Sequence, residues 1–416
     1  MNALTDRKVS KAAPIATAIG ELVDAGELAG AATLVWRGGQ VIQQTCVGWR
    51  DIAAGLPMVR DTLFRIASMT KPITSTLALM LMEEGRFALA DPIARWAPEF
   101  AEMHVLRSPT GPLDQTVPAE RPITFADLLT HRAGLSYGDF QQGPIALAYQ
   151  AALGGNIDST VAPDEWVTRL AALPLIDQPG ALFHYSHATD LLGFLIARIE
   201  DAPFGDVLER RLFKPLGMKD TGFTVPKAKQ DRRAGLSGFN ATGRLTTLPA
   251  VPGGHALAER PAEMRYVSGG QGLWSTLDDY LAFARMFVSK GTVDGVRLLR
   301  PETLALMMTN QLTNQQRTKS EMSGMPIFAA GHGFGLGVAV VMEPEKADPT
   351  RCGGGMGAVG WPGAYGGWWQ ADPNDNSVLI FLTHSMVDLE QMANGFGLGA
   401  WMAITQFQAL ASTLQS

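Results

Sequence analysis

Apolar residues recur at helical spacing in the segment that follows residue 70. Ile73, Leu77 and Leu81 are four residues apart, so they lie on one face of a helix. Pro72 fits the first turn of that helix, where its missing N–H is not needed, and Gly85 supplies a stop signal. The pattern therefore predicts a helix that begins close to residue 70.

Other patterns place strands near both ends of the chain and helices in its middle. The segments that predict strands are 31–37, 41–48, 331–342, 366–370 and 377–383, with a tight turn at 38–39. Helical spacing is found in 14–29, 124–131, 145–172 and 400–410. It is also found after Ser186, which can cap a helix that Ala202-Pro203 ends. Residues 109–122 are rich in proline and polar residues, which predicts a surface loop.

Strands from both ends of the chain can form one sheet, with a helical region inserted between them. We expect a sheet domain made of residues 1–70 and 235–416, and a mostly helical domain made of residues 71–234. The chain has 416 residues, 46% of them hydrophobic, which is enough for two such units with buried cores. A cleft between two units is a common place for an active site.

Charge and cysteine content exclude several classes of protein. A net charge of −6, without runs of lysine and arginine, argues against a nucleic-acid partner. The longest apolar runs, 77–82 and 378–382, are too short to cross a bilayer, and acidic residues interrupt any signal-peptide core near the N-terminus. We therefore expect a cytoplasmic protein with no membrane partner. Whether the two cysteines, Cys46 and Cys352, form a disulfide is left open.

Ser68 and Lys71 are the first candidates for chemistry. They lie three residues apart at the start of the predicted helix, so a hydroxyl and an amine share one face. A serine nucleophile needs a nearby base, and the N–H groups of a helix start stabilise negative charge. A Ser-x-x-Lys pair also arises by chance in long chains, so this interpretation depends on the other segments.

Two other patterns compete with this pair. Gly134-Leu135-Ser136-Tyr137-Gly138 matches the nucleophile elbow of α/β-hydrolases, with His384 as a candidate partner of Ser136. A helical pattern precedes this segment and none follows it directly, so we interpret it as a turn that ends a helix. His184 and His187 straddle a predicted helix start instead of sharing one helix, and no other pattern is typical of a metal or nucleotide site.

Several short motifs follow one another along the chain. They are Leu63-Phe64-Arg65-Ile66-Ala67-Ser68 with Lys71, Leu128-Leu129-Thr130-His131 with Gly134-Leu135, Tyr185-Ser186, Pro215-Leu216-Gly217-Met218, Gly269-Gly270 with Ser275-Thr276, Gly333-Phe334-Gly335-Leu336-Gly337 and Trp361-Pro362-Gly363-Ala364. With these motifs, the chain resembles the serine β-lactamase and penicillin-binding-protein superfamily, and within it the family VIII carboxylesterases. The resemblance implies a β-lactamase-like α/β (α+β) fold: an antiparallel sheet flanked by helices, with a mostly helical domain inserted.

The same resemblance implies a role for each matching residue. Ser68 would be the nucleophile, and Lys71 would accept its proton or act with Tyr185. Tyr185 would relay the proton to the leaving group and activate water for deacylation. The backbone N–H groups of Ser68 and Ala364 would form the oxyanion hole. Which of Lys71 and Tyr185 is the formal base is left open.

The chain departs from the family pattern at two places. The Tyr-x-Asn motif becomes Tyr185-Ser186-His187, so the amide that contacts a β-lactam side chain is replaced by His187. The Lys-Thr-Gly motif becomes Trp361-Pro362-Gly363, which removes a cation that faces a carboxylate. An aromatic ring at this place suits a neutral ester. We expect His187, Trp361 and Gly363 to contact substrate.

Together these observations predict a serine esterase that hydrolyses small, short-acyl carboxylic esters through an acyl-enzyme on Ser68, without a metal or cofactor. The expected partner is the small-molecule ester, and the oligomeric state is left open. Three alternatives remain. The first is acyl transfer, D-peptide cleavage or weak β-lactam hydrolysis by the same serine. The second is an elbow hydrolase that uses Ser136, and the third is a non-turnover, penicillin-binding-like sensor.

Overall fold

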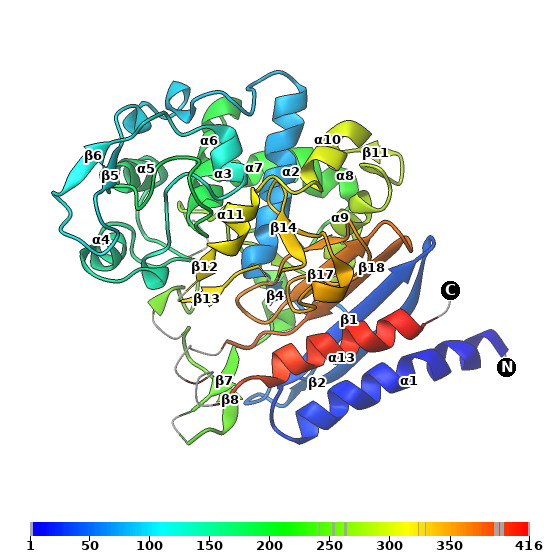
Figure 1. Ribbon diagram of the computed structural model, residues 1–416. Coiled ribbons are helices and arrows are strands. Elements are labelled where there is room, and N and C mark those ends of the chain that lie inside the picture. Colours follow the sequence, from blue (N-terminus) through cyan, green and yellow to red (C-terminus); the bar gives the residue numbers. More distant parts are fainter. Residues whose placement is uncertain are drawn as a thin grey trace.

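The computed structural model describes residues 3–414 apart from 241, 252–253, 262–263, 323, 329, 387–390 and 392–394. Within these residues, eight strands form one antiparallel sheet in the order β14-β15-β16-β17-β18-β1-β2-β3 (Figure 1). The strands are β1 (Gly30–Arg37), β2 (Gln40–Asp51), β3 (Leu56–Pro57), β14 (His332–Phe334), β15 (Ala339–Val341), β16 (Val359–Gly360), β17 (Trp368–Asp372) and β18 (Ser377–Leu382). The predicted antiparallel sheet is confirmed, and its strands come from both ends of the chain.

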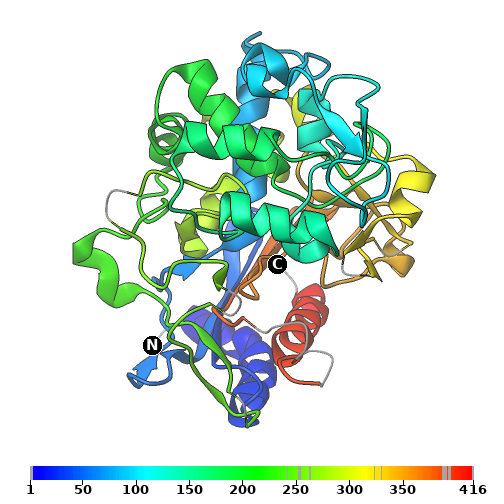
Figure 2. The same cartoon turned by 90° about the vertical axis from the view of Figure 1, so that its left-hand side faces the viewer.

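Strand β1 lies inside this sheet and is apolar on both faces. Ala31 and Val35 pack towards α1 (Ala3–Asp24) and α13 (Gly399–Thr413), whereas Leu34 belongs to the larger core on the opposite face. In Figures 1 and 2, α1 and α13 lie side by side beneath the sheet, and the other helices lie above it. Because β1 is covered on both faces, its sequence is almost continuously apolar.

The region above the sheet is built around α2 (Thr70–Glu83), which is buried along most of its length. This helix packs against α6 (Ala188–Glu200), which in turn packs against α3 (Phe125–Leu129). The further helices are α4 (Pro144–Leu153), α5 (Pro163–Ala171), α7 (Phe204–Leu208), α8 (Lys214–Leu216), α9 (Leu277–Ala284), α10 (Pro301–Met307) and α11 (Asn314–Thr318). The predicted division into domains at residues 70 and 235 stays a prediction.

The local signals at α2 and α3 led to correct predictions. The helix after Ser68 is confirmed, with Glu84 as its C-cap and Gly85 in the left-handed region at φ 73°. At α3 the side chain of Thr124 accepts a hydrogen bond from the backbone N–H of Asp127, and the side chain of Asp127 accepts one from the N–H of Thr124. This reciprocal pair is a capping box, and it fixes the start of the helix that the apolar spacing of 124–131 predicted.

Four predicted boundaries are wrong, and each error has a local cause. Helix α1 stops at Asp24, before residue 29, because Gly26 has φ 74°. The segment 145–172 splits into α4 and α5 because Gly154, at φ 77°, ends the first and Pro163 begins the second. The segment 331–342 is the hairpin β14–β15 and not a single strand. The predicted loop 109–122 contains β6 (Thr116–Pro118), which pairs with β5 (His104–Leu106).

The two cysteines are not joined: Cys46 and Cys352 are both free thiols. The open question about a disulfide is therefore answered. No helix in the described part of the chain combines the length and apolar composition needed to cross a membrane.

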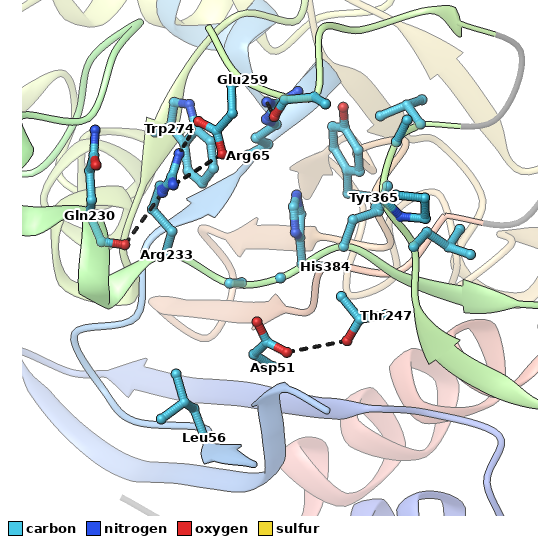
Figure 3. A pocket seen from close by; sticks show the side chains of 18 of the residues that line it. Asp51, Leu56, Arg65, Gln230, Arg233, Thr247, Glu259, Trp274, Tyr365 and His384 are labelled. Atoms are coloured by element: carbon cyan, nitrogen blue, oxygen red, sulfur yellow. Dashed lines mark hydrogen bonds and ion pairs between the residues drawn. The ribbon is translucent and has the colours of Figure 1, made fainter. Parts of the chain in front are cut away.

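His384 follows β18 directly and is buried beside Tyr365, with ring centroids 4.7 Å apart. Figure 3 shows both side chains on the wall of a cavity of about 300 Å³ that Arg65 also lines. Burial, followed by the positive charge of Arg65, lowers the pKa of His384 to about 3. The folded protein therefore keeps this imidazole neutral at a pH where the unfolded chain protonates it.

This difference predicts a pH-dependent stability that His384→Leu reduces. The unfolded imidazole has a pKa of about 6.5, so its protonation favours unfolding as the pH falls from about 6.5 towards the folded pKa. Between pH ~7.5 and pH ~5 we expect the wild type to lose about 2 kcal/mol more unfolding free energy than the variant. Urea titrations at both pH values measure this difference, and equal losses would contradict the assignment.

Candidate active site

Ser68 lies in a short 3-10 turn, Ala67–Met69, directly before α2. Just upstream, β4 (Phe64–Arg65) pairs with β9 (Trp274–Ser275) and fixes the entry of the chain into this turn. Ala67 has φ 43°, a left-handed conformation that costs a non-glycine residue on the order of 1 kcal/mol or more. The bend leaves the Ser68 side chain at the floor of a cavity, with the residue only 5% exposed.

Lys71 follows Ser68 by one helical turn and is 1% exposed. Its Nζ donates hydrogen bonds to Ser68 Oγ at 3.1 Å, to Tyr137 Oη at 3.3 Å and to the carbonyl oxygen of Gly270 at 3.0 Å. An ammonium group has three N–H donors, so these acceptors compensate for the water that Lys71 has lost. The same Nζ lies 4.5 Å from the ring centroid of Tyr185.

Tyr185 completes the contacts of the Ser68 hydroxyl. Its Oη donates to Ser68 Oγ at 2.6 Å and accepts from Trp361 Nε1 at 3.0 Å. The structure thus brings together a hydroxyl, an amine and a phenol from segments far apart in the sequence. One oxygen in contact with two groups that exchange protons is an arrangement suited to nucleophilic catalysis.

The residue after Tyr185 does not cap α6 as predicted. The N-cap of α6 is His187, and its side chain makes no capping hydrogen bond. Ser186 Oγ accepts from the backbone N–H of Ala188 at 3.3 Å and lies 3.1 Å from His131 Nδ1. Ser186 therefore ties the helix start to His131, whose ring centroid is 4.9 Å from that of Tyr185.

Gly363 and Ala364 lie against the backbone that leads into Ser68. A Cβ atom on Gly363 would lie 2.4 Å from the carbonyl oxygen of Ile66, so only glycine permits this approach. The N–H of Gly363 donates to the carbonyl oxygen of Gly367 at 2.7 Å, whereas the N–H of Ala364 has no backbone hydrogen-bond partner among the described residues. A free backbone donor therefore lies in the same cavity as Ser68.

This cavity has a volume of about 500 Å³. Of the residues predicted from the sequence, it is lined by Ser68, Tyr185, Trp361, Gly363 and Ala364. Most of its remaining wall is apolar and comes from Phe140, Ile157, Met322, Ile327, Met386 and Trp401. The volume lies within the range of ~300–1,000 Å³ that is common for small-molecule sites.

His187 is the predicted substrate-binding residue that does not line the cavity. It is 1% exposed and packs against the ring of Tyr137, with centroids 4.2 Å apart. Its Nδ1 lies 3.0 Å from Asp190 Oδ2. The expected contact between His187 and substrate is thus replaced by a buried contact one layer below the cavity.

A buried carboxylate balances the buried amine of Lys71. Asp190, on α6, is fully buried and accepts hydrogen bonds from Tyr137 Oη at 3.3 Å and from Ser268 Oγ. Tyr137 therefore accepts from Lys71 and donates to Asp190 through one hydroxyl. This bridge links the two charges without a direct ion pair.

The buried groups around this bridge keep defined charges. Burial acts to raise the pKa of Asp190, but the hydrogen bond and charge of His187, with the charge of Lys71, outweigh it and leave that pKa below its usual value. Burial, followed by the charge of Asp190, raises the pKa of Tyr137 well above its usual value. Burial and the charge of Lys71 lower the pKa of His131 well below its usual value. Tyr137 and His131 are therefore neutral at pH 7.

Tyr137 and Asp190 were not singled out from the sequence. Tyr137 lies inside the Gly-x-Ser-x-Gly segment, a motif in which the serine is the candidate for chemistry. Asp190 lies three residues after His187 at the start of a helix, a spacing that matches an ordinary surface residue as well as a buried partner. An aspartate among the apolar positions of α6 was the one available signal.

The alternative nucleophile Ser136 is not supported by its surroundings. Ser136 Oγ donates to the carbonyl oxygen of Tyr137 at 3.0 Å and accepts from Gln141 Nε2 at 2.9 Å. A short 3-10 turn, Gly138–Phe140, follows it, and the main sheet is antiparallel. His384 lies with Tyr365 on the wall of the cavity of about 300 Å³ described above, and not beside Ser136 (Figure 3). The elbow interpretation is therefore wrong.

Among the described residues, no group of three or more His, Cys, Asp or Glu is arranged to hold a metal ion.

Comparison with known proteins supports the same fold. A family model described as Beta-lactamase matches residues 15–398. Protein Rv1367c of Mycobacterium tuberculosis is 48% identical over 89% of both chains, and Esterase EstB of Burkholderia gladioli is 31% identical over 86% of both. The solved structure of "EstCE1, a hydrolase with promiscuous acyltransferase activity" superposes with a TM-score of 0.77 at 26% identity, covering 96% of this chain and 99% of that one. Because the model spans nearly the whole sequence and EstB matches over most of both chains, this chain belongs to the beta-lactamase family.

Proposed function

We propose that this protein is a serine esterase that hydrolyses small, short-acyl carboxylic esters through an acyl-enzyme on Ser68. The observation that carries the proposal is the pair of contacts at Ser68 Oγ, with Lys71 Nζ at 3.1 Å and Tyr185 Oη at 2.6 Å. The resemblance to EstB adds support, because that relative is named an esterase.

In the acylation step, Ser68 Oγ attacks the ester carbonyl carbon and gives up its proton. In the reactive state the Lys71–Tyr185 pair carries one proton fewer than an ammonium and a neutral phenol together, so it accepts this proton and passes it to the oxygen of the leaving alcohol. The proton belongs to the pair, because both groups contact the same oxygen. The N–H groups of Ser68 and Ala364 stabilise the negative charge on the former carbonyl oxygen.

In the deacylation step, a water molecule takes the place of the alcohol. Tyr185 takes a proton from this water as the water oxygen attacks the acyl carbon, and the Lys71–Tyr185 pair returns that proton to Ser68 Oγ when the acid leaves. Trp361 donates a hydrogen bond to Tyr185 Oη at 3.0 Å. This donor stabilises the phenolate form and holds the ring in place.

Acyl transfer is the second candidate, and the apolar lining of the cavity favours it. An apolar wall binds the carbon skeleton of an alcohol better than it binds water, so an alcohol can compete for the acyl group. EstCE1 is described as a hydrolase with promiscuous acyltransferase activity, which fits this view. Product analysis with an added alcohol separates the two: a new ester indicates transfer, and free acid alone indicates hydrolysis.

Ser68→Ala removes the proposed nucleophile. We expect it to abolish turnover of p-nitrophenyl acetate and covalent labelling by a fluorophosphonate, because no other side-chain oxygen among the described residues has hydrogen bonds with both Lys71 and Tyr185. Mass spectrometry of the wild type should locate the label on the peptide that contains Ser68. Ser136→Ala is the matched control and should keep the label. A wild-type label on Ser136 would refute the proposal.

Tyr185→Phe keeps the ring and removes the phenol oxygen. We expect kcat to fall by roughly 10²–10⁴-fold, the usual contribution of a general acid–base group. The fluorophosphonate adduct on Ser68 should still form, but slowly. Steady-state kinetics and the rate of labelling provide the measurements. A variant with wild-type kcat would show that Tyr185 only packs against Trp361.

Tyr137→Phe breaks the bridge between Lys71 and Asp190. We expect a fall of about tenfold or more in kcat, because the Lys71 amine loses an acceptor that holds it near Ser68. Tyr149→Phe is the control, since it also removes one buried hydroxyl, which accepts from the backbone N–H of Ser136. Both variants should lose similar unfolding free energy in urea. Equal losses of kcat would mean that the bridge has no special role.

A further inference from the structure

Arg351 is an unpaired cation on the wall of the candidate active site. It lines the cavity of about 500 Å³ together with Ser68 and Tyr185. Its guanidinium carbon lies 5.7 Å from the ring centroid of Trp361. Within the described part of the chain, its side chain has no ion pair within 4.0 Å and no hydrogen bond. The cation therefore lies on the wall of the cavity that holds Ser68, and no acidic side chain among the described residues pairs with it.

Other buried arginines in this protein do have acidic partners. Arg260 Nε lies 2.9 Å from Asp158 Oδ1, and Arg65 lies 3.6 Å from the other oxygen of the same carboxylate. The acidic side chain nearest to Arg351 in the sequence, Asp348, is engaged elsewhere, because its Oδ1 accepts hydrogen bonds from the N–H and hydroxyl of Thr350. These two buried guanidinium groups thus share one acidic partner, whereas the partly buried Arg351 has none among the described residues.

An unpaired guanidinium in this position is unfavourable in the free protein. Burial lowers the pKa of Arg351, although the charges of Asp348 and Tyr185 act in the other direction. A cation that has lost water and gained no anion raises the free energy of the folded state. Groups held in this way are common at functional sites, where a ligand supplies the missing partner.

The other residues of the cavity wall indicate that the partner of Arg351 is an anion and that this anion belongs to the substrate. The wall also carries a carboxylate, Asp139. It already has partners in His255 Nδ1 at 3.1 Å and the side chain of Asn156. Among the described residues of this wall, Asp139 thus has polar partners and Arg351 has none. It lies beside Trp361, whose Nε1 contacts Tyr185 Oη, so an anion bound there would be part of the molecule that Ser68 attacks.

We propose that the substrate carries a carboxylate group and that Arg351 binds it. This inference rests on the esterase function proposed above and narrows its substrate class to acidic esters. A planar guanidinium matches a carboxylate with two parallel N–H···O bonds, which gives both affinity and orientation. Trp361 removes one cation from the site, as the sequence indicated, and Arg351 from another segment supplies a cation beside it. The expectation of a neutral ester is thereby revised.

The test compares esters that differ only in charge. One pair places the group on the acyl part: mono-p-nitrophenyl glutarate and its neutral amide, p-nitrophenyl 4-carbamoylbutanoate. The second pair places it on the alcohol part: 4-acetoxybenzoate and 4-acetoxybenzamide. We expect the wild type to prefer the anionic member of at least one pair in kcat/KM, and the pair that shows the preference identifies which side of the ester bears the carboxylate.

Arg351→Met should reduce that preference by about tenfold or more, the scale of a charge-assisted hydrogen bond. Arg351→Lys, which keeps the charge but loses the planar fork, should restore part of it. Arg107→Met is the control, because Arg107 is an exposed cation outside the cavity, and it should keep the wild-type preference. A wild type without preference in either pair, or an unchanged preference in Arg351→Met, would overturn the proposal.

A binding measurement separates this inference from the proposed function. In the Ser68→Ala background, calorimetry should show that the anionic member of at least one of the two pairs binds about tenfold or more tightly than its neutral amide, and that adding Arg351→Met removes the difference. If the wild type cleaves no ester but this difference is found, the esterase proposal fails and the carboxylate site stands. If esters are cleaved at Ser68 and no difference is found, the carboxylate site fails alone.

Discussion

A buried amine is the constraint on which the candidate site depends. Lys71 is 1% exposed, and its three donors are satisfied only because Ser68, Tyr137 and Gly270 converge on it from three segments of the chain. Removing any acceptor leaves part of a charged group without compensation in a region of low dielectric. The bridge through Tyr137 to Asp190 extends the arrangement, so that a carboxylate stabilises the amine without pairing with it directly. The geometry at the Ser68 hydroxyl is thus a consequence of how one charge is buried.

Much of the arrangement could be predicted because local signals and global fold agree. The helix after Ser68 has apolar spacing, a proline in its first turn and a glycine at its end, and each of these signals acts over a few residues. The hairpin of β1 and β2 likewise follows from Gly38 and Gly39 between two apolar runs. The errors arose where one residue decides the backbone, as at Gly26 and Gly154, which are left-handed turns within longer apolar patterns.

What the sequence could not provide is the identity of long-range partners. Asp190 and Arg351 are two examples of residues whose partners, or lack of partners, the sequence does not show. One is an acid that accepts a hydrogen bond from a distant segment, and the other is a cation with no acidic or hydrogen-bonding partner among the described residues. The residues next to Asp190 and Arg351 in the sequence do not show whether these side chains have partners, because that depends on which distant segments the fold brings close. His187 shows the same limit in reverse, since a residue next to Tyr185 in sequence faces away from the cavity.

The sheet that joins the two ends of the chain has a consequence for synthesis. Strand β1 pairs with β18, and the hydroxyl of Thr383 bonds to the carbonyl oxygen of Gly30 across 353 positions. During translation, β1 and β2 leave the ribosome long before β18 is made. Their apolar surfaces and the free edge of β1 therefore stay uncovered for most of the synthesis time. Such a topology has high contact order, so the pairing that completes the sheet forms slowly and late. Truncation of the C-terminal strands therefore threatens solubility before it affects chemistry.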